Sequence, residues 1–343
     1  MVAAVDTMAY ARTGGVPWHR EGFAVSDDLT PKELAEAAQI TWTVSKRPSY
    51  TIDQPVYSEN AGLLNDPAHN HIVRDDNNTI LGVCSPEGWH PFQNVEIMAF
   101  YKKFCEAGHM SMETAGSLRD GRDIWALAKY SPGFTLPGGD QIEGYCLMAN
   151  SHKPGKAFKV LNTPVRVVCH NTLQMALRQT DATGMFKLAH RNEFNPAIFK
   201  EVEQVLGLAN EQLAAFQQQT EALASKQVKV ADFEKFVAQL LAPELLQEEG
   251  NKGFDGKTVE LRDQFRNGTH AAKVCEAMEL SPGADLKSAK GTWWGAVNAV
   301  TYVMDHEARS NVKGGALYNS WFGRNSTHKR KALDLATEYA LAA

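Results

Sequence analysis

The sequence predicts an α+β protein, with an antiparallel sheet and packed helices in the N-terminal half and an all-helical C-terminal half. In the N-terminal half, apolar and polar residues alternate between short turn motifs, which is the pattern of half-buried strands. From residue 196 onward, apolar residues recur instead at the spacing of one helix face. The length of 343 residues allows one large or two moderate domains. We expect a sheet domain over residues 1–180 and a helical domain over residues 181–343.

The first elements are indicated by capping and turn residues. Thr30 as N-cap, Pro31 in the first turn and Glu33 three residues after the cap predict a short helix that ends near Gln39. Alternation over residues 40–52 then predicts one or two strands. The following elements are a hairpin around an Asp-Asp-Asn-Asn turn, with strands 71–74 and 79–84, and a helix over residues 95–105.

Two further strand pairs are expected before residue 170. Strands 112–118 and 123–130 flank an Arg-Asp-Gly-Arg turn, and strands 141–150 and 157–169 flank the loop 151–155, which contains Pro and Gly. Helical spacing then resumes over residues 171–178.

The C-terminal half reads as helices separated by polar loops. The expected helices span residues 196–223, 230–241 and 259–280, with a surface loop over residues 244–256. Trp293 and Trp294 lie in an apolar helical stretch, and we assign both to the core.

Composition indicates a folded protein of the cytoplasm. Hydrophobic residues make up 43% and charged residues 22%, as in globular chains. No apolar run is long enough to cross a bilayer, and the first residues resemble no signal peptide, so we expect no membrane association. The five cysteines are widely spaced and contain no Cys-x-x-Cys pair, which favours free thiols in a reducing compartment.

Positive charge is concentrated in two stretches although the net charge is −5. No Asp or Glu occurs from Gly144 to Thr180 or from Ala308 to Leu333. The cations of the first stretch are Lys153, Lys156, Lys159, Arg166 and Arg178, and those of the second are Arg309, Lys313, Arg324, Lys329, Arg330 and Lys331. Such asymmetry is expected of an anion-binding surface, and chance is the alternative explanation.

Aromatic residues are interleaved with these cations. Tyr145 and Phe158 lie in the first stretch, and Tyr318, Trp321 and Phe322 lie in the second. Single-stranded nucleic acid is held by cations on its phosphates and by aromatic rings under its bases. Phe158 and Trp321 are our candidates for stacking, although an aromatic residue more often belongs to a core.

Motifs of the common cofactor enzymes are missing from the sequence, and we predict no cofactor, no metal and no catalytic residue. Cys169, His170 and Asn171 have the residue types of a thiol hydrolase, but neighbours on a strand point to opposite faces. His69 and His71 would share one strand face, yet no third metal ligand lies at a suitable spacing.

Several segments resemble the phage/plasmid-like protein family, also called domain of unknown function 932, which is associated with mobile elements. They are Pro17–His19, Leu81–Val83, Pro91–Asn94, Glu113–Leu118, Arg166–Leu173 and Thr292–Thr301. The resemblance implies no established reaction, cofactor or catalytic residue. The predicted order of hairpin, helix and twisted sheet also resembles phage single-strand annealing proteins, which implies oligomers that hold a strand in a basic groove.

Three hypotheses of function remain open. The first is a mobile-element protein that binds and anneals single-stranded DNA as a homo-oligomer, using Lys153, Lys156, Lys159, Arg166 and Arg178, with Arg324, Lys329, Arg330 and Lys331 as a second patch. The second is an interaction protein, such as an inhibitor of host defence, that binds a host protein. The third is an uncharacterised hydrolase-like enzyme that acts on nucleic acid or a small anion and uses polar residues around a pocket, such as His90, Asn94, His170 and Asn171.

Overall fold

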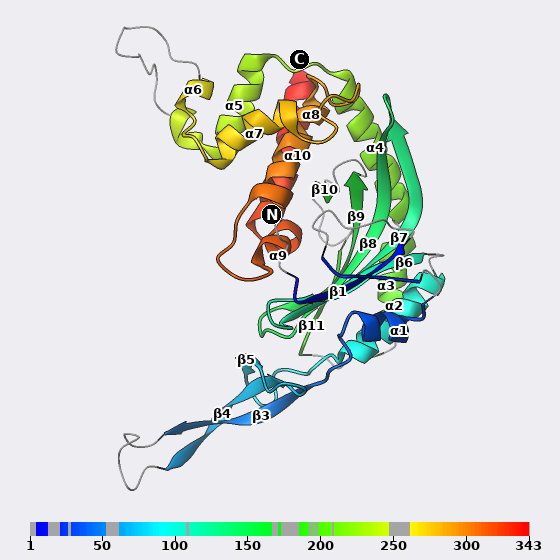
Figure 1. Ribbon diagram of the computed structural model, residues 1–343, viewed down its shortest axis with the longest axis vertical. Helices are drawn as coiled ribbons and strands as arrows, with labels where there is room; N and C mark the ends of the chain where they lie inside the picture. The colour runs from blue at the N-terminus through cyan, green and yellow to red at the C-terminus, as the bar shows by residue number, and fades with distance from the viewer. Residues whose placement is uncertain are drawn as a thin grey trace.

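The computed structural model describes most of the chain. The described residues are 5–12, 21–26, 29–52, 62–107, 110–166, 171–172, 185–191, 195, 198–207, 209–246 and 261–342. Within them, strands occupy the N-terminal half and helices the C-terminal half, as the sequence predicts (Figure 1).

A large sheet forms the centre of the molecule. Its strand order is β10-β9-β8-β7-β6-β1-β2, and β11 also pairs with β9. The strands are β1 (Thr7–Ala11), β2 (Phe23–Val25), β6 (Ser111–Leu118), β7 (Asp123–Leu136), β8 (Asp140–Ser151), β9 (Ala157–Arg166), β10 (Asn171–Thr172) and β11 (Met185–Ala189). The described pairs are antiparallel except β1 with β2, which is parallel.

Three strands form a second sheet that projects from the body as an arm (Figure 1). They are β3 (Val44–Ile52), β4 (Leu63–Arg74) and β5 (Ile80–Cys84), and the last two form the predicted hairpin. The arm carries exposed apolar side chains, among them Ile52 opposite Leu63.

Two helices pack on one face of the large sheet. In α1 (Pro31–Ala37), the Thr30 side chain accepts from the Glu33 backbone and Glu33 accepts in return, so the predicted capping box is confirmed. Helix α2 (Asn94–Ala107) follows the arm. Buried residues of both helices join Ile72 of the arm and Val160 of the large sheet in one hydrophobic cluster.

Most of the C-terminal helices pack around α8 and against the ends of β7 and β8. They are α3 (Ile198–Gly207), α4 (Ala209–Ser225), α5 (Val230–Leu241), the 3₁₀ turn η2 (Pro243–Leu246), α6 (Leu261–Gln264), α7 (His270–Leu280), α8 (Trp293–Tyr302), the π-turn η3 (Val303–Glu307), α9 (Gly315–Phe322) and α10 (Arg324–Ala342). Trp293 and Trp294 are buried there with Leu136 and Ile142, which confirms their assignment to the core. Among the described helices, none combines the length and apolar character needed to cross a bilayer.

Several expected boundaries are wrong. Asn171 and Thr172 belong to strand β10 rather than to a helix, and β11 extends the sheet past residue 180 by pairing with β9. The expected helix 196–223 is described as α3 and α4, on either side of residue 208, which lies outside the described residues. The expected helix 259–280 is wrong, because α6 ends at Gln264 and a turn with Gly268 at φ of +81° precedes Thr269, which caps α7. The rest of the expected helix 171–178 lies outside the described residues.

Candidate nucleic-acid interface

Strand β9 places Lys159 and Phe158 on opposite faces of the sheet. Phe158 and Val160 are both fully buried and point into the cluster beneath α2, where Phe158 lies edge-on to Phe100 with ring centroids 5.9 Å apart. Lys159 lies between them in sequence and therefore faces the other side, since side chains alternate along a strand. Phe158 presents no face to a base, and its predicted stacking role is corrected.

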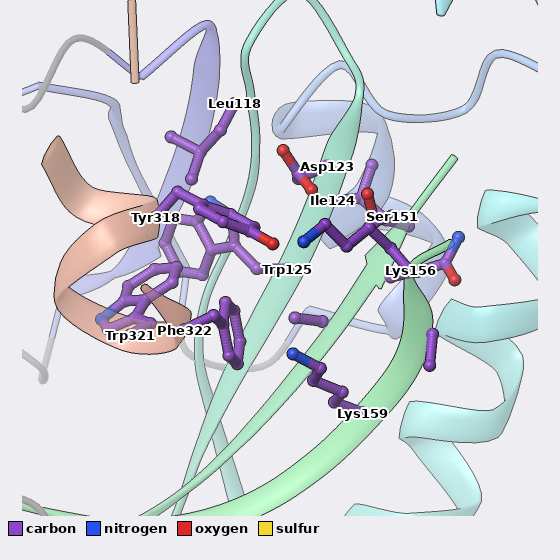
Figure 2. A pocket seen from close by; sticks show the side chains of 13 residues that line it. Leu118, Asp123, Ile124, Trp125, Ser151, Lys156, Lys159, Tyr318, Trp321 and Phe322 are labelled. Carbon is purple, nitrogen blue, oxygen red and sulfur yellow. The ribbon is translucent and has the colours of Figure 1, made fainter. Parts of the chain in front are cut away.

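Helix α9 covers that other face of the sheet. Trp321 packs edge-on against Trp125 of β7, with ring centroids 5.1 Å apart, and Tyr318 and Phe322 join the same cluster. Trp321 is half-buried in this contact. It therefore anchors the helix to the sheet, while the two neighbouring rings turn toward β9 (Figure 2).

The two acid-free stretches meet at this contact. Lys156 Nζ lies 6.0 Å from the ring centroid of Tyr318, and Lys159 Nζ lies 4.5 Å from that of Phe322. Figure 2 shows both ammonium groups directed toward the α9 rings across a shallow hollow. Cation–π attraction stabilises each pair. Residues far apart in sequence thus form one surface that alternates cations with aromatic rings.

A third lysine joins this surface from β11. Lys187 is exposed and pairs in register with Lys159. Burial lowers the pKa of Lys159, and Lys187 and Lys156 lower it further, whereas Asp123 raises it. Lys187 is not among the predicted site residues, because the alternation over residues 185–189, where Phe186 and Leu188 are buried, is a short signal.

The acid that lines the hollow is already paired. Asp123 accepts a hydrogen bond from Arg119 Nε, and its side chain is 6% exposed. The guanidinium carbon of Arg119 lies 3.9 Å from the ring centroid of Tyr318, on which it packs. The lysines therefore dominate the charge that the hollow presents to solvent.

The hollow is too small for a small-molecule substrate. Its volume is about 10 Å³, roughly that of one water molecule. Asn150 lines it at 1% exposure, and its amide nitrogen and oxygen have no hydrogen-bond partner within the described part of the chain.

The structure describes the remaining cations of the first stretch to different extents. Lys153 is exposed in the turn between β8 and β9, next to Lys156. Arg166 ends β9 and its backbone pairs with Asn171, but its side chain lies outside the described residues, as does the whole of Arg178.

The predicted second patch is dispersed around α10. Lys329 is 1% exposed and its Nζ lies 2.7 Å from Asp305 Oδ1, so its predicted contact with phosphate is corrected. Arg330 is exposed. Burial raises the pKa of Asp334, and the charge of Arg330 lowers it by a smaller amount. Arg324 and Lys331 are exposed on another part of the helix.

Of the residues suggested for an enzyme, Asn94 belongs to a buried hydrogen-bond network. Asn94 is fully buried, and its amide nitrogen donates to the Trp42 carbonyl. Its Oδ1 lies 2.9 Å from His152 Nε2. The backbone N–H of His90 donates to the His190 carbonyl. His170 lies outside the described residues.

The two histidines of the arm have local partners. His69 Nδ1 lies 2.8 Å from Asp66, and His71 Nε2 lies 3.2 Å from the Ser49 hydroxyl. Among the described residues, no three His, Cys, Asp or Glu side chains gather as a metal site would require.

Comparison with curated proteins finds no match, and comparison with solved structures finds none either. A family model described as a domain of unknown function, DUF932, matches residues 81–336. This match covers the large sheet from β6 onward, Lys153, Lys156 and Lys159, and the aromatic residues of α9. The chain therefore belongs to the DUF932 family.

Proposed function

We propose that this chain is a mobile-element protein that binds single-stranded DNA across the surface between β9 and α9, and that it anneals or protects the strand without covalent chemistry. We call this surface, made of Lys153, Lys156, Lys159, Lys187, Tyr318 and Phe322, the lysine–aromatic surface. The observation that carries the proposal is the contact of the two acid-free stretches at Lys159 and Phe322.

The chemistry of this surface suits a single strand. Phosphates are attracted by lysines that have no acid partner among the described residues, and rings accept bases of any sequence. In the free protein the ammonium groups of Lys156 and Lys159 lie near the rings of Tyr318 and Phe322. A bound strand draws these ammonium groups to its phosphates and leaves the ring faces to the bases.

Fluorescence anisotropy with a labelled oligonucleotide of about 30 nucleotides tests the proposal across a range of salt concentrations. Each phosphate contact adds about −0.7 to the slope of log K against log salt. The triple variant K153A/K156A/K159A should therefore reduce the magnitude of that slope by up to about 2.

A matched control removes the same charge elsewhere. Lys32, Lys102 and Lys103 are exposed on α1 and α2, on the opposite side of the sheet. The variant K32A/K102A/K103A should keep the wild-type slope. An equal reduction of the salt slope in both triple variants would mean that only net charge matters. The proposal that the lysine–aromatic surface binds the strand would then be rejected.

The same experiment distinguishes the alternative hypotheses of function. A wild-type chain that fails to bind single-stranded DNA or RNA at low salt, where screening is weakest, would leave the interaction-protein hypothesis in its place. The expected homo-oligomer stays a prediction, and light scattering of the same samples with and without oligonucleotide measures it.

A further inference from the structure

A large cavity lies among the C-terminal helices, away from the lysine–aromatic surface. Its volume is about 750 Å³, within the range of about 300–1,000 Å³ that is usual for small-molecule sites. Helix α9 separates the two places, because Tyr318 and Phe322 line the hollow whereas Asn319 lines the cavity. The cavity and the hollow share no lining residue.

One wall of the cavity is cationic. Arg309, Arg324, His270 and His328 line it, and none of the described lining residues is Asp or Glu. The nearby carboxylate of Glu307 lies 3.1 Å from Lys273, which balances its charge. Within the described part of the chain, neither arginine forms an ion pair.

Two helices begin at this wall. His270 is the first residue of α7, and Arg324 is the first residue of α10. The positive dipole end of a helix attracts anions, although in α7 the Thr269 side chain already accepts from the backbone N–H of Ala272. The field of the two helix ends adds to that of the two arginine side chains, and phosphate is the anion for which arginine has the best matched geometry.

Another part of the lining is apolar. Leu240 and Leu241 end α5 and Pro243 begins η2, and all three line the cavity. A ligand that fills the space therefore needs an anionic end and a larger uncharged body.

The cationic wall is held in position by buried polar contacts. Lys329 of α10 donates to Asp305 of η3 at 2.7 Å and lies 3.0 Å from the Ser320 hydroxyl of α9. Asn325, which lines the cavity, donates to the Met304 carbonyl at 2.9 Å. These contacts tie η3, α9 and α10 together and fix the backbone of α10, from which Arg324 and His328 extend.

From these observations we infer that the cavity binds a phosphate monoester of nucleotide size. Arg309 and Arg324 hold its phosphate, and its uncharged part packs on Leu240, Leu241 and Pro243. This site is independent of the proposed single-strand binding and goes beyond it.

Two histidines make the binding sensitive to pH. Burial lowers the pKa of His328, and Lys331, His270 and Arg324 lower it further. Burial and Lys273 lower the pKa of His270, whereas Glu307 raises it. A bound phosphate dianion raises both pKa values, so binding takes up protons and strengthens as pH falls from about 8 to about 6.5.

Isothermal titration of the full chain with adenosine monophosphate, adenosine and inorganic phosphate tests the inference. We expect adenosine monophosphate to bind with one site per chain, inorganic phosphate to bind more weakly and adenosine not to bind. R309A and R324A should each weaken binding of adenosine monophosphate by about tenfold or more. Exposed Arg266 lies outside the cavity lining, so R266A should bind as the wild type does.

Thermal melting shows whether each variant is folded, and single-strand binding by R309A separates the two sites. Loss of nucleotide binding with retained single-strand binding supports an independent cavity site. The inference is overturned when adenosine monophosphate does not bind the wild-type chain, when adenosine binds equally well, or when folded R309A and R324A both bind like the wild type. The H270N/H328N variant should lose the pH dependence, and a dependence that persists in it would contradict the assigned role of the histidines.

Discussion

Lys329 Nζ lies 2.7 Å from Asp305 Oδ1 in the interior of the C-terminal half. Both side chains are almost fully buried, at 1% and 5% exposure, and each comes from a different element. The pair joins α10 to η3 with Ser320 of α9 as a third partner. Lys329 is therefore a structural residue, although its place in a basic stretch of sequence predicts a surface role.

We expect K329A to lower the free energy of unfolding by about 3–5 kcal/mol, because it leaves the carboxylate of Asp305 buried without its cation. Chemical denaturation measures the change. R330A, one residue further along α10 and exposed, should change stability by no more than about 0.5 kcal/mol. Equal stability of the two variants would show that Lys329 is not held as described.

F158A should cost about 3–5 kcal/mol of stability, because it leaves a cavity in the cluster beneath α2. F322A removes a half-buried ring and should instead weaken single-strand binding by about 1–3 kcal/mol if that ring supports a base. Melting and anisotropy on both variants separate the two effects. Should F322A lose stability as severely as F158A while its binding is unchanged, Phe322 would be a core residue only.

His152 should make the protein sensitive to acid. It is fully buried beside Asn94 and Trp42, and burial followed by the charges of His190 and Arg74 lowers its pKa to about 3. Between this value and the ordinary value of 6.5, the unfolded chain binds more protons than the folded chain, so stability falls as pH falls.

The contribution of one such group is up to about 1.4 kcal/mol per pH unit. Denaturation of the wild type and H152Q from pH 7 to about pH 4 measures it, and the variant should have the shallower slope although it is less stable at pH 7. Identical slopes would mean that His152 has the same pKa in the folded and the unfolded chain, which would contradict its burial.

The described cysteines should react slowly with thiol reagents in the native state. Cys84, Cys105, Cys146 and Cys275 are free and buried, and burial raises the pKa of Cys105 to about 12 and that of Cys275 to about 11. Since the thiolate is the reactive form, labelling near pH 8 should become fast only after unfolding. Rapid native labelling at any of these four residues would contradict its burial, and a native disulfide would contradict the expectation of free thiols.

Local signals in the sequence predicted much of the fold. The capping box of Thr30 and Glu33, the turn before Thr79 and the helix from Val230 to Leu241 each depend on neighbouring residues, and each is present in the structure. Strand β11 was missed because a five-residue alternation is a weak signal without its partner strand.

The candidate site was predicted only in part. The acid-free stretches do meet, but their aromatic contacts come from Tyr318 and Phe322 rather than from Phe158. Strand alternation already places Phe158 and Lys159 on opposite faces, so that correction was available from the sequence. The packing of α9 on β7 through Trp321 and Trp125 could not be predicted from the sequence.

The sequence by itself determined the class of fold, the change from strands to helices and the two stretches that lack acids, because these follow from local periodicity and composition. Tertiary structure alone decided which cations reach solvent. Lys329 and Lys159 belong to the same residue type in similar stretches, yet one is paired with Asp305 inside a helical core and the other lies beside Phe322 at a sheet surface. The charge that a lysine presents depends on its neighbours in space, and those neighbours come from elements far away in the chain.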